Sequence, residues 1–219
     1  MLGRDGHTDV ATAREEMVDR LERTGHVERP STAAALRAVP RHEFVPAGRR
    51  RRAYVDTPLP IDEGQTISAP HMVATMVDLL ALDPGDEVLE VGTGCGYHAA
   101  VTAEVVGAGN VYSVEYHAAL AEAARETLAD LGYGDVHVRA GDGHAGWPEH
   151  APYDAAYLTC AASDLPDAVV AQVRPGGRVV APVGDRRQRL VLARKHDDGA
   201  VRREYHGGVR FVPMRGGDG

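Results

Sequence analysis

The fold of this chain is decided by one stretch, Val88-Leu89-Glu90-Val91-Gly92-Thr93-Gly94-Cys95-Gly96-Tyr97. A short apolar run leads directly into three closely spaced glycines, and a helical pattern follows over residues 97–106. This order predicts a buried strand, a tight turn and a helix, which together form the first βα unit of an open α/β sheet. Ligands of such sheets bind outside the carboxyl ends of the strands, so a ligand site is expected at the glycine turn.

The spacing of the glycines argues against a dinucleotide. The fingerprint G-x-G-x-x-G would need a glycine at position 97, but that position is Tyr97, and the third glycine comes one residue early, at Gly96. Glu90 lies two residues before the first glycine, where its carboxylate would face a positively charged ligand. S-adenosylmethionine, which carries a sulfonium and an ammonium group, fits this pattern. The alternative is a glycine turn that binds nothing.

Two further acidic residues follow predicted strands. Glu115 ends the second strand, where a carboxylate can accept both hydroxyls of a ribose, as it does in nucleotide-binding folds. Asp142, within Gly141-Asp142-Gly143, follows the third strand and could accept the exocyclic amine of an adenine. The alternatives are an ordinary surface charge for Glu115 and a turn-forming side chain for Asp142.

Alternating strands and helices extend outward from the glycine turn and predict right-handed crossovers in a parallel sheet. The tail is expected to close one edge of this sheet with antiparallel strands, and two helices are expected at the start of the chain, the second capped by Ser31. The proline- and glycine-rich residues 44–70 are expected to be extended. Predicted helices are 11–24, 32–39, 71–82, 97–106, 117–131 and 166–173; predicted strands are 87–91, 110–114, 136–139, 153–158, 178–182, 189–194, 201–205 and 209–213.

Length and composition limit the class of protein. A chain of 219 residues has room for one α/β domain, and no apolar run approaches the ~20 residues of a membrane span. The net charge is -8 and Lys195 is the only lysine, which argues against a nucleic-acid partner. The absence of a secretory signal and the presence of only two cysteines predict a cytoplasmic protein. The spacing of Cys95, His98 and Cys160 supplies too few ligands for a structural zinc, so no metal is predicted.

One cationic block, Arg49-Arg50-Arg51-Arg52, lacks the interleaved aromatic residues of an RNA-binding segment. We interpret it as a solvated loop, with contact to an acidic peptide as the alternative.

Several longer stretches carry family-specific motifs: 37–46, 53–54, 58–61, 64–74, 88–97, 174–178 and 211–213. Together they resemble the protein-L-isoaspartate O-methyltransferase family, and its haloarchaeal members most of all. The resemblance covers residues 14–213. It implies a Rossmann-like class I methyltransferase: a mostly parallel, seven-stranded twisted sheet with helices on both faces, an N-terminal helical extension and an antiparallel C-terminal edge. Residues 1–70 would form a helical lid segment over substrate and cofactor, and residues 71–219 the S-adenosylmethionine-binding core of one compact domain.

The resemblance implies methyl transfer from S-adenosyl-L-methionine to the carboxylate of L-isoaspartyl residues in damaged peptides and proteins, with S-adenosyl-L-homocysteine as product. A monomer is expected. Ser68 matches the active-site serine, whose hydroxyl would orient the substrate carboxylate; a helix cap at Ala69-Pro70 is the alternative or additional role. The implied cofactor-binding residues are Gln65, Thr66, Ile67, Ser68, His71, Glu90, Gly92, Gly94, Gly96, Glu115, Asp142 and Gly143.

Two departures from the family pattern carry expectations. Residues 159–166 lack the usual alanine-rich run followed by a proline and an acidic residue, which predicts a looser grip on the substrate backbone. Met214-Arg215 and the short end predict that a contact between the C-terminus and the cofactor or substrate is missing. Two other functions stay open: methylation of ordinary aspartate in a dedicated protein, and a non-catalytic cofactor-binding adaptor. The acidic excess and single lysine further predict a salt-rich cytoplasm, where ions screen the field between an anionic enzyme and an anionic substrate.

Overall fold

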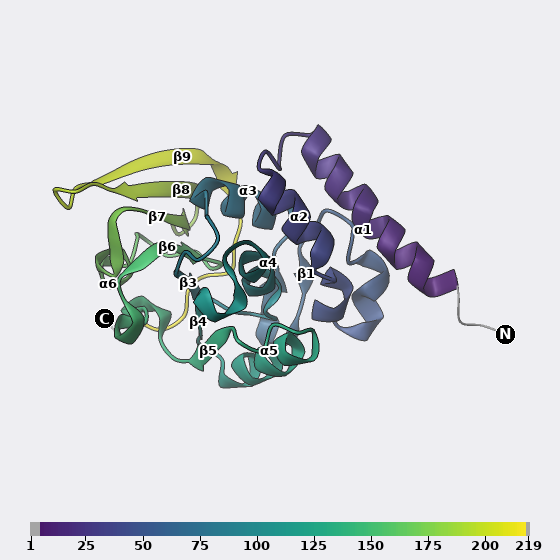
Figure 1. Cartoon of the computed structure of the whole chain (residues 1–219). Coiled ribbons are helices and arrows are strands. Elements are labelled where there is room, and N and C mark those ends of the chain that lie inside the picture. Colours follow the sequence, from purple (N-terminus) through teal and green to yellow (C-terminus); the bar gives the residue numbers. More distant parts are fainter. Residues whose placement is uncertain (1–4, 218–219) are drawn as a thin grey trace.

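A computed structural model describes residues 5–217 of the chain (Figure 1). Its centre is a seven-stranded sheet with the order β5-β4-β3-β6-β7-β8-β9. Strands β3 to β7 pair in parallel, whereas β8 is antiparallel to both of its neighbours. The predicted α/β class and antiparallel edge are therefore confirmed. The strands are β3 Val88–Val91, β4 Val111–Glu115, β5 His137–Ala140, β6 Tyr153–Leu158, β7 Val173–Val183, β8 Gln188–Lys195 and β9 Val201–Val209.

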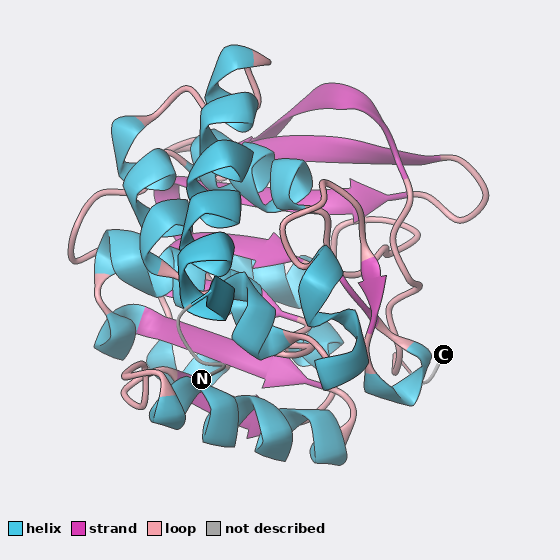
Figure 2. Cartoon of the chain, turned by 90° about the vertical axis from the view of Figure 1, so that its right-hand side faces the viewer, coloured by secondary structure: helices cyan, strands magenta, loops and turns pink. Residues whose placement is uncertain are grey.

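Helices surround this sheet (Figure 2). The α-helices are α1 Asp5–Arg23, α2 Pro30–Ala38, α3 Pro70–Leu80, α4 Tyr97–Val106, α5 Ala118–Asp130 and α6 Asp167–Ala171. Short 3-10 helices are η1 Arg41–Phe44, η2 Ala47–Arg52, η3 Asp62–Gly64, η4 Ala108–Asn110, η5 Gly143–Ala145 and η6 Pro148–His150. A separate two-stranded ribbon pairs β1 Leu59–Pro60 with β2 Thr66–Ile67. Within the described part of the chain, no helix has the length and apolarity needed to cross a membrane.

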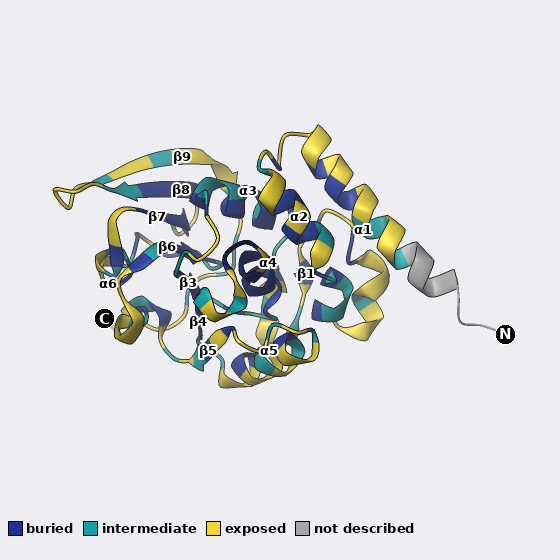
Figure 3. Cartoon of the chain, in the orientation of Figure 1, coloured by how far each residue is buried: buried dark blue, intermediate teal, exposed yellow. Residues whose placement is uncertain are grey.

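Strand residues alternate between two hydrophobic cores, as the two-residue period of a pleated strand requires. On β3, Val88 joins the core under α1 to α4, and Leu89 joins the core on the opposite face. Helix α4 is apolar nearly all round and is buried except at Glu104. It lies between the sheet and α2, so the N-terminal helices complete the first core (Figure 3).

Four local predictions differ from the structure. Helix α2 starts at Pro30 without a side-chain cap, so Ser31 lies inside the first turn, where a proline suits the helix start. The segment 44–70 is not simply extended, because η2, η3 and the β1–β2 ribbon organise it. Strand β7 begins at Val173, so it includes residues 174–177, which the sequence predicts as the turn before this strand. The predicted strand 209–213 is not formed; instead β9 runs to Val209, and Pro213 makes a single bridge to Ala161.

The order of the strands fixes where a ligand can bind. From β3 the chain builds outward through β4 and β5, and then returns to add β6 and β7 on the other side of β3. The loops that follow β3 and β6 therefore leave the sheet in opposite directions and open a crevice between them. In doubly wound folds this topological switch point is the usual ligand site.

Candidate functional site

Two adjoining cavities lie at the carboxyl ends of β3 and β6. Together with the space open to solvent, the outer cavity measures about 510 Å³ and the inner cavity about 300 Å³, and they share Thr66, Gly92, Gly94 and Thr159. The outer cavity is further lined by Gln65, Val91, Val114, Glu115, Tyr116, His117, Gly143, Cys160, Val212, Pro213, Met214 and Arg215. The inner cavity is further lined by Ile67, Ser68, Val73, Thr93, Cys95, Tyr97 and His98.

Glycine is required at two positions of the turn after β3. Gly92 has φ +98°, and a Cβ there would lie 2.3 Å from the Oγ1 of Thr159. Gly96 has φ +88°, precedes the first residue of α4, and a Cβ there would lie 3.1 Å from Cγ of Leu128 on α5. Gly92 thus brings the loops after β3 and β6 together beside the cavities. Gly96 lines neither cavity and instead lets α5 pack close to the turn.

Glu115 ends β4 and is 5% exposed. Its Oε2 accepts a hydrogen bond from the backbone N–H of Gly94 at 2.9 Å, and its Oε1 accepts one from the N–H of His117 at 3.0 Å. A carboxylate oxygen has two lone pairs, so each can accept a further hydrogen bond from a ligand hydroxyl. This side chain therefore fixes the glycine turn and lines the outer cavity at once.

The structure places Glu90 differently from the sequence prediction. Its side chain is fully buried and lines neither cavity. Oε2 accepts a hydrogen bond from Ser113 at 2.5 Å, and Oε1 accepts one from Tyr157 at 2.9 Å. Burial raises the pKa of Glu90 to about 8, although these two hydrogen bonds lower it. Glu90 is thus a protonated group beneath the turn at neutral pH, and no anionic face is presented to a ligand.

Asp142 also holds protein rather than lining the cavities. Its Oδ1 accepts hydrogen bonds from N and Nδ1 of His144, both at 2.9 Å, so the turn-forming alternative is the observed arrangement. Its Oδ2 accepts one from the N–H of Gly217 at 2.7 Å. Partial burial acts to raise the pKa of Asp142, but the hydrogen bonds from Gly217 and His144 outweigh it and lower that pKa. Neighbouring Gly143 does line the outer cavity.

The C-terminal segment contributes to the wall of the outer cavity. The N–H of Ala161 donates to the carbonyl of Val212, and the N–H of Met214 donates to the carbonyl of Ala161, both at 2.8 Å. These bonds place residues 212–215 in the cavity wall. The loop after β6 is therefore held to the C-terminal segment by backbone pairing.

Ser68 follows β2 and is half-buried in the inner cavity. Helix α3 begins at Pro70 with Ala69 as its N-cap and no side-chain cap, so the capping role considered for Ser68 is not found. Within residues 5–217 no hydrogen bond of the Ser68 hydroxyl is present. A free hydroxyl beside the glycine turn can donate to a bound carboxylate.

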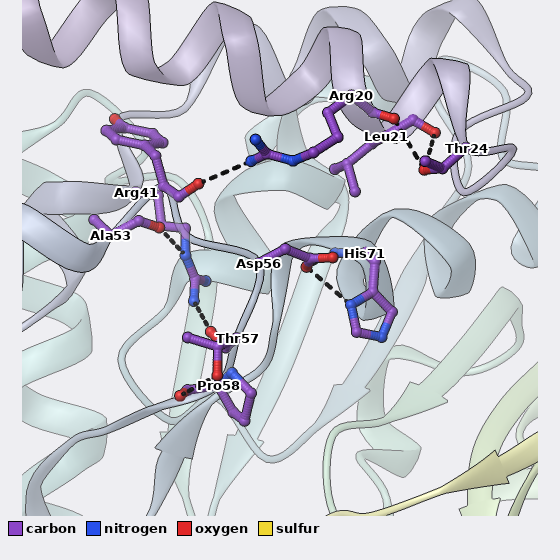
Figure 4. Close-up of polar contacts among 10 residues, drawn as sticks. Arg20, Leu21, Thr24, Arg41, Ala53, Asp56, Thr57, Pro58 and His71 are labelled. Carbon is purple, nitrogen blue, oxygen red and sulfur yellow. Dashed lines mark hydrogen bonds and ion pairs between the residues drawn. The ribbon is translucent and has the colours of Figure 1, made fainter.

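His71 lines neither cavity. Its backbone N–H and its Nδ1 lie 2.9 and 2.8 Å from Oδ1 of Asp56, as Figure 4 shows for the side chains. Asp56 thereby satisfies a free N–H at the start of α3 and places negative charge at the positive end of that helix. His71 consequently anchors the segment before β1 and does not line the cofactor pocket as predicted.

Arg41 is fully buried and also holds the segment before β1. Its Nε donates to the carbonyl of Ala53 at 2.7 Å, and its Nη2 reaches that of Thr57 (Figure 4). Its guanidinium also lies 4.9 Å from the ring centroid of Tyr97. Burial lowers the pKa of Arg41. Its position in a matching stretch, 37–46, was a signal, but no local pattern assigned it this role.

Sequence reasoning missed several residues that line the cavities. In the inner cavity, His98 and the Tyr97 hydroxyl are buried without a hydrogen-bond partner among the described residues, and burial lowers the pKa of His98 to about 3. In the outer cavity, Tyr116 is half exposed directly after Glu115.

Burial raises the pKa of Cys95 to about 11 and that of Cys160 to about 12, so both thiols keep their protons at neutral pH. No cluster of three or more potential metal ligands occurs within residues 5–217.

The parallel sheet, the glycine turn after β3, the carboxylate at the end of β4 and the crevice between them define a class I S-adenosylmethionine-dependent methyltransferase. The family model described as Protein-L-isoaspartate(D-aspartate) O-methyltransferase (PCMT) matches residues 12–219. The chain belongs to this family.

Curated relatives match over nearly their whole length. Protein-L-isoaspartate O-methyltransferase 2 of Archaeoglobus fulgidus is 54% identical over 209 residues, covering 95% of each chain. The Methanopyrus kandleri enzyme is 52% identical, covering 94% of this chain and 93% of its own.

Solved structures agree. One protein-L-isoaspartate O-methyltransferase has a TM-score of 0.83 at 33% identity, covering 93% of this chain and 66% of that one. A Plasmodium falciparum structure holding S-adenosyl-L-homocysteine, 23% identical over 92% of this chain and 98% of that one, has a TM-score of 0.80 and supports the fold.

Proposed function

We infer that this chain methylates the free carboxylate of L-isoaspartyl residues in damaged proteins, with S-adenosyl-L-methionine as methyl donor. One structural observation carries the site: Ser68, with its hydroxyl free, lies in a cavity that shares Gly92, Gly94 and Thr159 with the larger cavity beside Glu115. Membership of the family, with relatives matched over nearly their full length, supplies the reaction.

The residues present fit the cofactor. The outer cavity lies beside the carboxyl end of β3, at the switch point where ligands of such sheets bind. Val91, Val114 and Met214 give it an apolar wall suited to a flat adenine, and the second lone pairs of Glu115 suit ribose hydroxyls. We propose Gln65, Thr66, Ile67, Gly92, Gly94, Glu115 and Gly143 as cofactor contacts, while Gly96, Glu90, Asp142 and His71 hold the surrounding backbone.

Bound there, S-adenosylmethionine supplies an electrophilic methyl group. The nucleophile is a carboxylate with a pKa of roughly 4, already ionised at neutral pH, so no general base is required. Buried, protonated Glu90 adds no negative charge to the site. This suits a site that has to receive a carboxylate. What the chain contributes is orientation: Ser68 donates to one carboxylate oxygen and leaves the other free to attack. Orientation of this kind supplies effective molarities of roughly 10⁵ M or more.

A paired-peptide assay tests the function. Labelled S-adenosylmethionine is supplied with an isoaspartyl peptide and with its aspartyl twin, and base-labile methyl ester is counted. Label on the isoaspartyl peptide alone is the expected result. Label on the twin would instead indicate the aspartate methyltransferase, and binding of both cofactor and peptide without label would indicate the adaptor.

We propose that residues 1–70 act as a lid over the site, joined to the core of residues 71–219 in one domain. The tip of the β1–β2 ribbon supports this role, because Ile61 would lie 3.6 Å from a Cβ on Gly94. Oε2 of Glu63 also lies 3.7 Å from Nδ1 of His117, at the start of α5. The ribbon is thus tied to both the glycine turn and the far wall of the outer cavity.

We further propose that the protein acts as a monomer in a salt-rich cytoplasm and has no nucleic-acid partner. The acidic excess, 32 acidic against 24 basic residues with a single lysine, supports this setting. Gel filtration with light scattering measures the oligomeric state, and a monomer mass near 23.4 kDa is expected.

A further inference from the structure

A cationic groove lies outside both cavities at the same edge of the sheet. It is formed by the turn between β7 and β8 and by the end of β9, and it contains four exposed arginines, Arg186, Arg187, Arg189 and Arg210. Asp185 is the one acidic residue in its lining. None of the four arginines has an ion-pair partner within residues 5–217, although Arg189 lies 3.9 Å from the ring centroid of Tyr205. This set is called the arginine groove below.

The charge of the arginine groove contrasts with that of the whole molecule. The chain carries a net charge of -8, and many of its other arginines are neutralised by ion pairs, as Arg37 is by Glu15, Asp19 and Glu22. Four unpaired guanidinium groups beside one carboxylate leave a local excess of positive charge in an anionic protein. Contact between Arg189 and Tyr205 also holds one guanidinium in place without neutralising it.

Two sets of hydrogen bonds join the arginine groove to segments beside the proposed active site. The N–H of Gly184, before the β7–β8 turn, donates to the carbonyl of Ala162 at 2.8 Å, two residues after Cys160 of the outer cavity. On the other side, the side-chain amide of Gln188 makes two hydrogen bonds with the backbone of Phe211. Its Oε1 accepts from the N–H at 2.6 Å, and its Nε2 donates to the carbonyl at 3.0 Å. Arg210 is three residues before Pro213 in the cavity wall, so their Cα atoms are at most about 11 Å apart.

We propose that the arginine groove binds acidic side chains that flank the isoaspartyl residue in protein substrates. An extended peptide advances about 3.3 Å per residue, so side chains three to five residues from the modified position reach about 10 to 17 Å. Arginine suits this task because its planar guanidinium can bind a carboxylate with two hydrogen bonds. The arginine groove would therefore select isoaspartyl sites in acidic surroundings, offsetting locally the repulsion between an anionic enzyme and an anionic substrate. This inference rests on the proposed methyltransferase function.

Isoaspartyl peptides of equal length test it, with glutamate, glutamine or lysine at three to five residues on either side of the isoaspartate. The test variant is Arg186→Gln/Arg187→Gln. A charge-matched control is Arg23→Gln/Arg202→Gln, which alters exposed arginines on α1 and at the opposite end of β9. Assays use the lowest salt concentration at which the circular dichroism spectrum is native, because salt screens exposed charges.

For the wild type, kcat/KM for the glutamate peptide on one side is expected to exceed that for the glutamine peptide by about three- to tenfold, mainly through KM. The test variant is expected to lose this preference while kcat on the glutamine peptide stays unchanged, and the control is expected to keep it. Equal rates for all three wild-type peptides, a preference for lysine, or equal loss in the control would overturn the proposal. The proposal would also be overturned if an oligonucleotide bound at these arginines and did not compete with the glutamate peptide.

The two levels of inference fail in different ways. If the glutamine peptide is methylated but flanking charge has no effect, only the arginine groove assignment is wrong. If no isoaspartyl peptide is methylated by natively folded wild type, the methyltransferase function fails and the assignment fails with it.

Discussion

At the residue scale, the two polar groups beside the glycine turn have opposite tasks. Ser68 has a free hydroxyl in the inner cavity, whereas Glu90 is buried and hydrogen-bonded by Ser113 and Tyr157. A site that receives an anionic carboxylate gains from a neutral hydrogen-bond donor and would lose from a second anion. The protonated state of Glu90 therefore suits the proposed chemistry as well as the packing.

Replacing Ser68 by alanine is expected to lower kcat by about 10- to 100-fold, because a hydrogen bond to a charged group contributes roughly 1.5–3 kcal/mol. Affinity for S-adenosylmethionine should change little, since the hydroxyl is assigned to the substrate carboxylate. Steady-state kinetics with an isoaspartyl peptide and calorimetric titration of the cofactor separate the two effects. Ser31→Ala, an exposed serine that caps nothing, is the control. Full activity in Ser68→Ala would refute the orienting role.

Glu90 makes stability depend on pH in a defined window. The ordinary pKa of this group is 4.5, and burial raises it to about 8 in the folded state. Between these values the folded protein holds one more proton than the unfolded chain, so stability falls as pH rises from about 4.5 to 8, by roughly 3 kcal/mol at pH 7. Glu90→Gln mimics the protonated form and is expected to flatten this decline. Thermal unfolding at pH 5 to 8 measures it, with exposed Glu126→Gln as the control; parallel pH curves for wild type and Glu90→Gln would contradict it.

At the element scale, the parallel core could be predicted because its signals are local. Helix 97–106 and strand 153–158 have the predicted limits, since a glycine turn or an apolar run bounded by turns marks each one. The tail could not be predicted in the same way. Whether residues 209–213 form a strand depends on Ala161, which pairs with Pro213 and Val212 from about fifty residues earlier, and no local pattern encodes that contact.

The same distinction applies to the site. Gly92, Gly94 and Glu115 line the outer cavity as expected, because the ends of adjacent parallel strands must meet at one edge of the sheet. The resemblance predicts a cofactor role for His71, and the place of Asp142 after a strand predicts one for Asp142. Each is hydrogen-bonded to a distant residue that only the folded chain supplies, Asp56 for His71 and Gly217 for Asp142. A sequence motif fixes which residues are near a site, whereas long-range hydrogen bonds decide which of them face it.

Packing between elements can be tested at Gly96. An alanine there would adopt an unfavourable φ of +88° and approach Leu128 to 3.1 Å, so Gly96→Ala is expected to destabilise the fold by about 2–4 kcal/mol. Gly132 has the same φ but open space around it, so Gly132→Ala measures the backbone strain alone, about 1 kcal/mol. Urea unfolding compares the two. Equal losses would show that contact between α5 and the glycine turn does not require a glycine.

At the scale of the whole molecule, charge acts in two opposing ways. The acidic excess repels an anionic substrate at long range, whereas the arginine groove would attract one at short range beside the site. Salt screens both, because the Debye length falls from about 10 Å at 0.1 M to about 3 Å at 1 M. Overall activity and flanking-charge preference should therefore respond to salt in opposite directions.

We expect kcat/KM for the neutral-flanked isoaspartyl peptide to rise several-fold between 0.1 and 2 M KCl, because screening removes the repulsion felt by the isoaspartyl carboxylate. Over the same range, the advantage of the glutamate-flanked peptide should shrink toward one, since the exposed arginine contacts are screened as well. An osmotically matched sucrose series is the control, because sucrose favours compact states without screening charge. A rate that peaks at low salt and collapses in molar KCl would refute a salt-adapted enzyme. An equal rise in sucrose would assign the effect to folding rather than to charge.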